Sequence, residues 1–321
     1  MEHRTTHRTM RKLLLAGAFG VVLAAMSASP ALSQNYAPAI DQTSLLNMRF
    51  FDSGLFRFDD ATVAFAPAGQ VDVQAEVTDA NGKSIAKFDH FPDYVYTATT
   101  FGRIRVKGPA DVNITEPGKY QIQYIINGKP STRLPFTVKV EGSGDPFNPA
   151  KKYQFDGPWR SLAYIWMRPY KNTTIPDVVF WTGKPDLKAG TTKDQTIAKL
   201  FFNGKMIAHS NRAQGHITSE HYKQSTHTFL APHEARRAHE APPFTREKLA
   251  NGNYNIRVER QSDGALLRNF AFTVAGGQIQ PIKRAVLGYQ PHEDFVVPRV
   301  PVFGSSTYEF KQAIWINDPN R

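Results

Sequence analysis

Apolar side chains recur at every second position along most of this chain, which is the pattern of strands that bury one face. Two segments show the alternation clearly, with one face formed by Val71, Val73, Ala75 and Val77 and another by Tyr120, Ile122, Tyr124 and Ile126. Convincing helical periodicity does not appear in the sequence. We therefore predict an all-β chain.

Glycine-containing turns separate the alternating segments. Each of the following steps lies between two such runs: Asn81-Gly82, Asn127-Gly128, Asn203-Gly204 and Asp263-Gly264. Asn-Gly and Asp-Gly are strong signals of a β-hairpin, because these residues tolerate the positive φ of a tight turn. A hairpin is expected at each step.

The chain also repeats itself in sequence. The matching segments, in chain order, are 81–86 with 203–208, 118–120 with 252–254, and 136–138 with 272–274. From the turn glycine to the phenylalanine of the last segment there are eight residues in both copies, from Gly128 to Phe136 and from Gly264 to Phe272. Matches in the same order predict a duplicated unit.

Each copy, with about a hundred residues of short strands, resembles an immunoglobulin-like or fibronectin-III-like β-sandwich. Tyr120 and Tyr254 stand where such sandwiches carry a tyrosine corner, a phenol that hydrogen-bonds to upstream backbone. The resemblance implies two tandem sandwiches. The predicted organisation is a signal peptide at 1–33, a first domain at 34–142, a linker at 143–157, a second domain at 158–277 and a C-terminal extension at 278–321. The extension alternates again over 305–316, so we expect it to pack back as an edge strand.

The N-terminus reads as an export signal. A basic segment precedes the apolar run 13–26, and small residues including Ala31 and Ser33 follow it. The run is shorter than the roughly twenty residues that a membrane span needs. We predict cleavage after Ser33, no transmembrane segment in the mature chain, and a periplasmic or secreted protein of a bacterium. The chain has no cysteine, which excludes disulfides, thiolate metal sites and a lipid-modified cysteine anchor.

The formal net charge of +11 favours acidic partners. The basic residues are scattered rather than clustered, which is typical of an ordinary solvated surface. We expect no nucleic-acid partner, and predict a protein or acidic glycan partner in the cell envelope. The oligomeric state cannot be read from the sequence.

A histidine-rich insertion distinguishes the second copy. From the hairpin glycine to the corner tyrosine there are 38 residues in the first copy and 50 in the second, and the difference falls within residues 209–243. The candidate metal ligands there are His216, His221, His227, His233 and His239. Imidazole suits zinc, copper or nickel, but the spacing matches no helix face and no H-E-x-x-H motif. A pH-responsive loop and a merely polar loop are the other interpretations, and no cofactor is otherwise predicted.

Aromatic residues mark a second candidate site. Segment 161–170 places alternate rings on one strand face, and the candidate ligand-binding residues are Tyr164, Trp166, Tyr170 and Trp181. Such rings can stack on sugars, which predicts glycan binding as an alternative function. They can equally form the core of a β-sandwich.

No catalytic signature appears in the sequence. Nucleophile-elbow, phosphate-loop and dinucleotide-binding motifs are missing, and the carboxylates form no readable pair. We therefore expect an exported, non-enzymatic binding or scaffolding protein of the bacterial envelope. Metal binding through the insertion and glycan binding through the aromatic residues remain the alternatives.

Overall fold

The computed structural model describes residues 39–40, 49–58, 61–64, 71–94, 101–142, 151–210, 215–219, 222–231, 241–280, 282, 299–301 and 310–320. Their regular structure consists of β-strands and three short 3₁₀ helices. The prediction of an all-β chain is confirmed. The predicted signal peptide lies outside the described residues.

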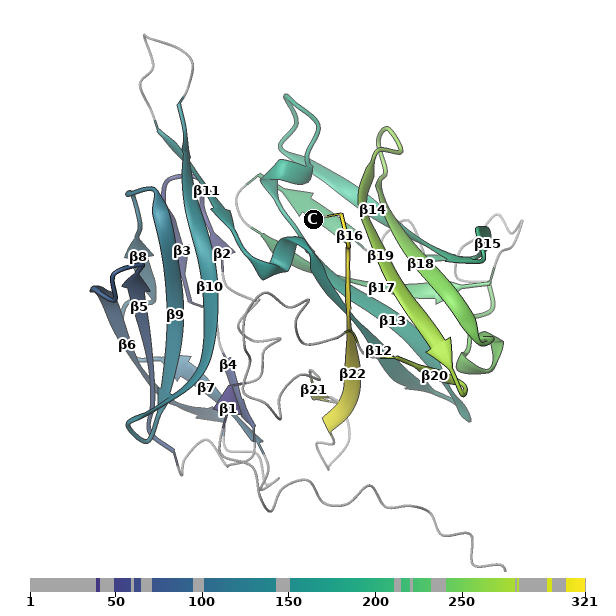
Figure 1. Ribbon diagram of the computed structural model, residues 1–321, viewed down its shortest axis with the longest axis horizontal. Coiled ribbons are helices and arrows are strands. Elements are labelled where there is room, and N and C mark those ends of the chain that lie inside the picture. The colour runs from purple at the N-terminus through teal and green to yellow at the C-terminus, as the bar shows by residue number, and fades with distance from the viewer. Residues whose placement is uncertain are drawn as a thin grey trace, which may run out of the picture. The chain divides into compact units, whose positions relative to one another are not determined.

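The N-terminal half of the chain builds an open eight-stranded sheet, a half-barrel (Figure 1). Its spatial order is β1 (Ala39–Ile40), β4 (Ala61–Ala64), β7 (Phe101–Val106), β6 (Ser84–Tyr94), β5 (Val73–Asp79), β9 (Gly118–Ile126), β10 (Lys129–Glu141) and β11 (Lys152–Asp156). A separate small sheet contains β2 (Arg49–Phe50), β3 (Leu55–Arg57) and β8 (Asp111–Asn113). Phe56 of β3 lies 6.1 Å from Phe136 of β10, ring centre to ring centre, so the two sheets share a core.

The C-terminal half forms an eleven-stranded sheet. Its order is β20 (Gln278–Ile279), β19 (Leu266–Ala275), β18 (Gly252–Arg260), β14 (Lys193–Phe202), β15 (Lys205–Ser210), β17 (Lys223–Leu230), β13 (Thr173–Thr182), β12 (Leu162–Tyr170), β22 (Phe310–Asn317) and β21 (Arg299–Pro301), with β16 (Gly215–Thr218) paired to β14. The 3₁₀ helices are η2 (Pro158–Arg160), η3 (Lys184–Asp186) and η5 (Arg246–Lys248).

Strand β22 closes this sheet into a barrel. It pairs antiparallel with β12, and its last residue, Asn317, also pairs with Ala271 of β19. Figure 1 shows β22 in yellow beside β12. The predicted extension therefore supplies a strand to the barrel wall rather than a free edge. The finer prediction of two tandem sandwiches is not confirmed, because alternation determines which strand face is buried but not whether sheet edges meet.

The alternation seen in the sequence corresponds to burial. In β9, every second residue from Tyr120 to Ile126 is buried and the residues between them are partly exposed. In β18 the same holds for Tyr254, Ile256 and Val258. Strand β13 differs, because Ile175 to Thr182 are buried on both faces. Both faces of this strand are therefore covered.

The predicted turns lie between paired strands. Asn127-Gly128 joins β9 to β10, and Asn203-Gly204 joins β14 to β15. At both steps the two residues have positive φ, which is the backbone of the tight type I′ hairpin turn. Asparagine and glycine adopt this conformation at lower cost than other residues.

The two repeated segments have the same pairing. Tyr120 faces Phe136 across β9 and β10, and Tyr254 faces Phe272 across β18 and β19. Each tyrosine hydroxyl donates a 2.8 Å hydrogen bond to the carbonyl oxygen four residues earlier, at Glu116 and at Ala250. Both rings also stack on their phenylalanine partners. The predicted tyrosine corner therefore exists in both halves of the chain.

Part of the predicted linker is regular structure. Residues 152–156 form β11, which extends the first sheet by pairing with β10 over Thr137–Glu141. The next residues, 158–160, form η2 and bury Trp159. Residues 143–150 lie outside the described part of the chain.

Candidate functional site

A pocket of about 290 Å³ lies where segments from both halves of the chain meet. Its volume is near the lower end of the range typical of small-molecule sites, about 300–1,000 Å³. The described residues that line it are Phe50, Asp52, Tyr153, Gln154, Phe155, Lys184, Pro185, Leu187, Ala189, Ser219 and Tyr222. Aromatic and apolar side chains thus surround a few polar groups, as in many ligand sites.

The wall from the first half comes from the turn after β2 and from β11. The backbone N–H of Tyr153 donates a 2.8 Å hydrogen bond to the carbonyl oxygen of Asp52, which fixes the turn against the strand. Gly54 in this turn has φ of +86°, and a side chain there would lie 3.0 Å from the Ile114 carbonyl oxygen. Glycine is required at this position by both the backbone conformation and the close approach.

The opposite wall is held by a buried ion pair. Asp186, at the end of η3, accepts hydrogen bonds of 2.7 and 3.0 Å from the guanidinium of Arg268 on β19. Both side chains are almost fully buried, and Asp186 also accepts a bond from the N–H of Gly183. Arg268 Nε has no partner among the described residues. A bidentate pair of this kind fixes direction as well as distance, so it anchors η3, the short helix that begins at Lys184.

Lys184 and Asp52 form an ion pair at the pocket wall. Lys184 Nζ lies 2.9 Å from Asp52 Oδ2. The side chains are 38% and 46% exposed, so water screens their attraction and the pair can exchange partners at little cost. The pair offers one donor group and one acceptor group side by side, with no net charge.

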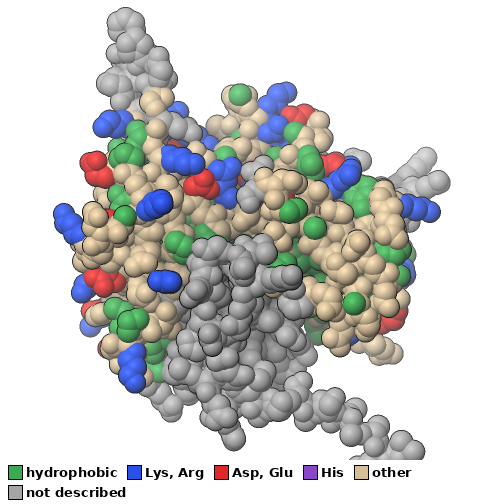
Figure 2. Space-filling view, viewed as in Figure 1, with side chains coloured by type: hydrophobic (Ala, Val, Ile, Leu, Met, Phe, Trp, Pro, Cys, Tyr) green, Lys and Arg blue, Asp and Glu red, His purple; other side chains and the backbone are tan. Residues whose placement is uncertain are grey.

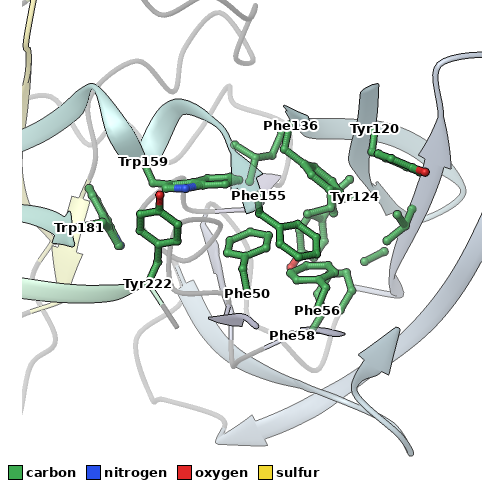
Figure 3. Close-up of a cluster of buried hydrophobic side chains, with 14 of the residues drawn as sticks. Phe50, Phe56, Phe58, Tyr120, Tyr124, Phe136, Phe155, Trp159, Trp181 and Tyr222 are labelled. Atoms are coloured by element: carbon green, nitrogen blue, oxygen red, sulfur yellow. The ribbon is translucent and has the colours of Figure 1, made fainter. Parts of the chain in front are cut away.

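Tyr222 forms the floor of the junction between the two walls. It is 8% exposed, and burial raises the pKa of its phenol above the ordinary value, so the hydroxyl stays protonated. The ring lies against the backbone of Gly183, where a side chain would come within 2.9 Å of it. Figure 3 shows the hydroxyl pointing toward the indole of Trp159, whose ring centre is 6.0 Å from that of Tyr222.

Three rings pack at this junction. Phe50 stacks on Trp159 at 4.4 Å between ring centres and meets Tyr222 edge-on at 6.4 Å (Figure 3). Aromatic pairs of this kind contribute about 0.5–1.5 kcal/mol beyond the burial of their area. They make the floor of the pocket rigid. Neither the Tyr222 hydroxyl nor the Trp159 indole nitrogen has a hydrogen-bond partner among the described residues.

The predicted metal ligands are only partly described. His216 lies on β16 with an exposed side chain, whereas His227 on β17 is fully buried. His221, His233 and His239 lie outside the described residues. Among the described residues, no group of three or more histidine, aspartate or glutamate side chains is placed to hold a metal ion. Metal binding by the insertion stays a prediction.

His227 takes part in a hydrogen-bond network inside the barrel. Its Nδ1 lies 2.7 Å from Ser210 Oγ and its Nε2 lies 2.9 Å from Thr196 Oγ1. The ring stacks on Phe180 at 5.1 Å, and a side chain at Gly215 would collide with it. Burial lowers the pKa of His227 to about 3, so the ring is neutral. Both nitrogens are engaged, which makes His227 a core residue rather than an open ligand.

The predicted aromatic site divides into buried and partly exposed rings. Tyr164 and Trp181 are 4% and 1% exposed, and Tyr164 meets Trp315 of β22 edge-on at 5.6 Å. These two rings offer no open face to a sugar. Trp166 and Tyr170 are partly exposed, and glycan binding by them stays a prediction. None of the four residues lines the pocket.

The pocket includes residues of the histidine-rich insertion that the sequence analysis did not single out. Ser219 and Tyr222 belong to the insertion 209–243 and line the pocket, whereas the described candidate ligands His216 and His227 do not. Asp52 and Lys184 are 132 residues apart and carry no motif. No signal in a single sequence relates them.

Charged side chains are interspersed over the visible face of the described residues. Figure 2 shows lysine and arginine side chains next to aspartate and glutamate. Several charged side chains of the described residues are paired, as in the contact of 2.6 Å between Arg57 Nε and Asp111 Oδ1. The interspersed charges match the scattered basic residues of the sequence.

No protein-family model matches this chain, and no curated protein or solved structure shows a significant match to it. In the described part of the chain, no helix has the length and apolar character needed to cross a bilayer.

Proposed function

We propose that this chain is an exported, non-enzymatic binding protein of the bacterial envelope, and that the pocket beside Lys184 and Tyr222 is its ligand site. The observation that carries the proposal is the composition of this pocket. Rigid aromatic walls from two distant segments enclose a paired acid and base and two neutral polar side chains, Gln154 and Ser219. Pockets that combine apolar walls with a few convergent polar groups are typical of ligand sites.

The titratable groups of the pocket favour binding over catalysis. Among the described lining residues, the carboxylate of Asp52 is paired with Lys184. Burial raises the pKa of the Tyr222 phenol, so it stays protonated at neutral pH and can donate a hydrogen bond. The ammonium and the carboxylate of this ion pair suit a polar ligand that both donates and accepts hydrogen bonds. These groups are better suited to holding a ligand than to moving its protons.

We further propose that the two halves of the chain derive from a duplicated immunoglobulin-like or fibronectin-III-like unit, with domains at 34–142 and 158–277. The shared tyrosine corners and the matching register of β9–β10 and β18–β19 support this origin. The added strands β22 and β12 then account for the closed barrel of the second unit. The pocket lies outside the repeated segments, which is where new function is added to a rigid scaffold.

Export to the envelope rests on the N-terminal segment, and a protein or acidic glycan partner rests on the net charge of +11. Both remain part of the proposal. N-terminal sequencing of the protein released by an expressing bacterium tests export, with a mature end at Gln34 as the expected result.

Ligand-dependent melting of paired variants tests the site. Ala189→Trp adds a large ring at the pocket wall, and Ala80→Trp adds the same ring at an exposed hairpin. A ligand that binds the pocket raises the melting temperature of the natural protein and of Ala80→Trp by mass action, but not that of Ala189→Trp. An equal rise in all three proteins would place the ligand elsewhere.

A further inference from the structure

We propose that the pocket recognises a neutral, hydroxyl-rich ring, the chemistry of a monosaccharide unit. This inference rests on the proposed function, because it names the ligand class of the same pocket. It differs from glycan binding through the strand that carries Trp166 and Tyr170, since neither of those residues lines the pocket.

The charges of the described pocket lining favour a neutral ligand. Lys184 and Asp52 already neutralise one another at 2.9 Å. An anion that paired with Lys184 would lie beside the Asp52 carboxylate, and a cation on Asp52 would lie beside the ammonium. A hydroxyl group both donates and accepts, so two neighbouring hydroxyls can bind the pair without separating it.

The walls of the pocket favour a ring. Phe50, Phe155 and Tyr222 present aromatic carbon, and Pro185 and Leu187 add aliphatic surface. A sugar ring carries C–H groups on its faces and hydroxyls around its edge. It can therefore place an apolar face on the aromatic wall while its edge reaches Gln154, Ser219 and the ion pair. A fully apolar ligand would displace water from these polar groups and offer them no hydrogen bond in return.

A buried hydroxyl supplies an independent observation. The Tyr222 hydroxyl belongs to a residue that is only 8% exposed, and it has no hydrogen-bond partner among the described residues. The indole nitrogen of Trp159, toward which it points, also has none (Figure 3). Unsatisfied buried polar groups are costly, so a ligand hydroxyl or a water molecule that gains access to this buried hydroxyl forms a bond that the described residues leave unmade.

Zwitterionic ligands such as amino acids are the competing class. Their carboxylate and ammonium need several donors and acceptors each to replace lost water. The pocket offers one ammonium, one carboxylate and two neutral side chains among its described polar lining. Hydroxyl groups cost less to desolvate than full charges, so a neutral ring fits this lining better.

Calorimetric titration of the full mature chain tests the ligand class. The neutral probes are glucose, galactose, mannose and N-acetylglucosamine, each also as its methyl glycoside. The charged probes are glucuronic acid, glucosamine and phenylalanine. We expect saturable binding of at least one neutral sugar, with the matched charged probes weaker by roughly tenfold or more because of the desolvation of a full charge. Equal binding of the methyl glycoside indicates a terminal glycan residue as the source, and its loss indicates a free sugar.

Two variants locate the binding. Tyr222→Phe keeps the ring and removes the hydroxyl, so neutral-sugar affinity should fall about two- to tenfold, the contribution of one hydrogen bond. Ala189→Trp should remove the binding, and Ala80→Trp should leave it unchanged. Neutral-sugar binding that is unaffected by Ala189→Trp would overturn the inference.

The failure of this inference can be separated from that of the proposed function. If a charged probe binds, Ala189→Trp blocks it and neutral sugars do not bind, the pocket is a ligand site but the ligand class is wrong. If a broad metabolite set yields no ligand that Ala189→Trp blocks, both are wrong.

Discussion

Lys184 Nζ lies 2.9 Å from Asp52 Oδ2 and joins two segments that are 132 residues apart in sequence. Lys184 follows the barrel strand β13, and Asp52 follows β2 of the small sheet. The pair thus belongs to the two walls of the pocket at once. Because the ion pair is partly exposed, it contributes little to stability but remains available to a ligand.

Replacing this ion pair should change stability little. We expect Lys184→Met to alter the free energy of unfolding by less than about 1 kcal/mol, because water screens partly exposed pairs. Urea denaturation measures the change, and the double variant with Asp52→Asn completes a mutant cycle. A coupling energy of several kcal/mol would mean that the pair is a structural clamp rather than a recognition element.

Breaking the buried pair should be far more damaging. Arg268→Met leaves the Asp186 carboxylate buried without its partner, and we expect a loss of about 3–5 kcal/mol of stability. The matched control is Arg57→Met, which removes an exposed arginine from its contact with Asp111 and should cost no more than about 1 kcal/mol. Equal effects in the two denaturation curves would contradict the anchoring role given to Arg268.

The two tyrosine corners should contribute equally to the free energy of unfolding. Tyr120→Phe and Tyr254→Phe each remove one hydrogen bond to a backbone carbonyl, so each should cost about 0.5–1.5 kcal/mol. Tyr222→Phe is the control, because its hydroxyl has no partner among the described residues, and it should be neutral or slightly stabilising. A cost for Tyr222→Phe as large as that of the corners would show that its hydroxyl is already satisfied.

The buried histidines should make the fold sensitive to acid. Burial lowers the pKa of His227 to about 3 and that of His90 to about 4, both below the ordinary value of 6.5. The unfolded chain therefore takes up protons first, and stability is lost as the pH falls through 6.5 toward the folded pKa values. Between about pH 7 and about pH 5, His227 alone should account for a loss of about 2 kcal/mol.

Paired variants separate His227 from the other titrating groups. His227→Gln should flatten the pH dependence of unfolding, and His216→Gln, at an exposed position, should leave it unchanged. If His227→Gln does not fold, NMR titration of the natural protein tests whether the His227 ring stays neutral. The His227 ring signals should stay constant down to about pH 4, and a midpoint near the ordinary value would contradict its burial.

Local features of this fold could be predicted from the sequence, whereas its closure could not. Alternation in β9 and the Asn127-Gly128 step are local signals, and the structure has the expected strand and turn. The pairing of Asn317 with Ala271, which closes the barrel, depends on edges that meet only in three dimensions. The same limit applies to the Asp186–Arg268 pair, whose residues are 82 positions apart.

The candidate site shows that residue type alone does not determine the role of a side chain. Histidines are candidate metal ligands because imidazole binds metals. Inside the barrel, however, both ring nitrogens of His227 form hydrogen bonds, one with Ser210 and one with Thr196. Tyr222 carries no motif and gains its role from burial beside Phe50. The chemistry of a side chain depends on its burial and on its neighbours in the fold, and neither can be read from the local sequence.

NMR shift mapping tests the central claim most directly. A neutral monosaccharide that binds should give its largest amide shifts at Asp52, Lys184, Ser219 and Tyr222, which surround the pocket. The same titration on Ala189→Trp should give none. If the largest shifts fall instead on His216 and its neighbours, or on the strand with Trp166 and Tyr170, the pocket is not the binding site and the account is contradicted.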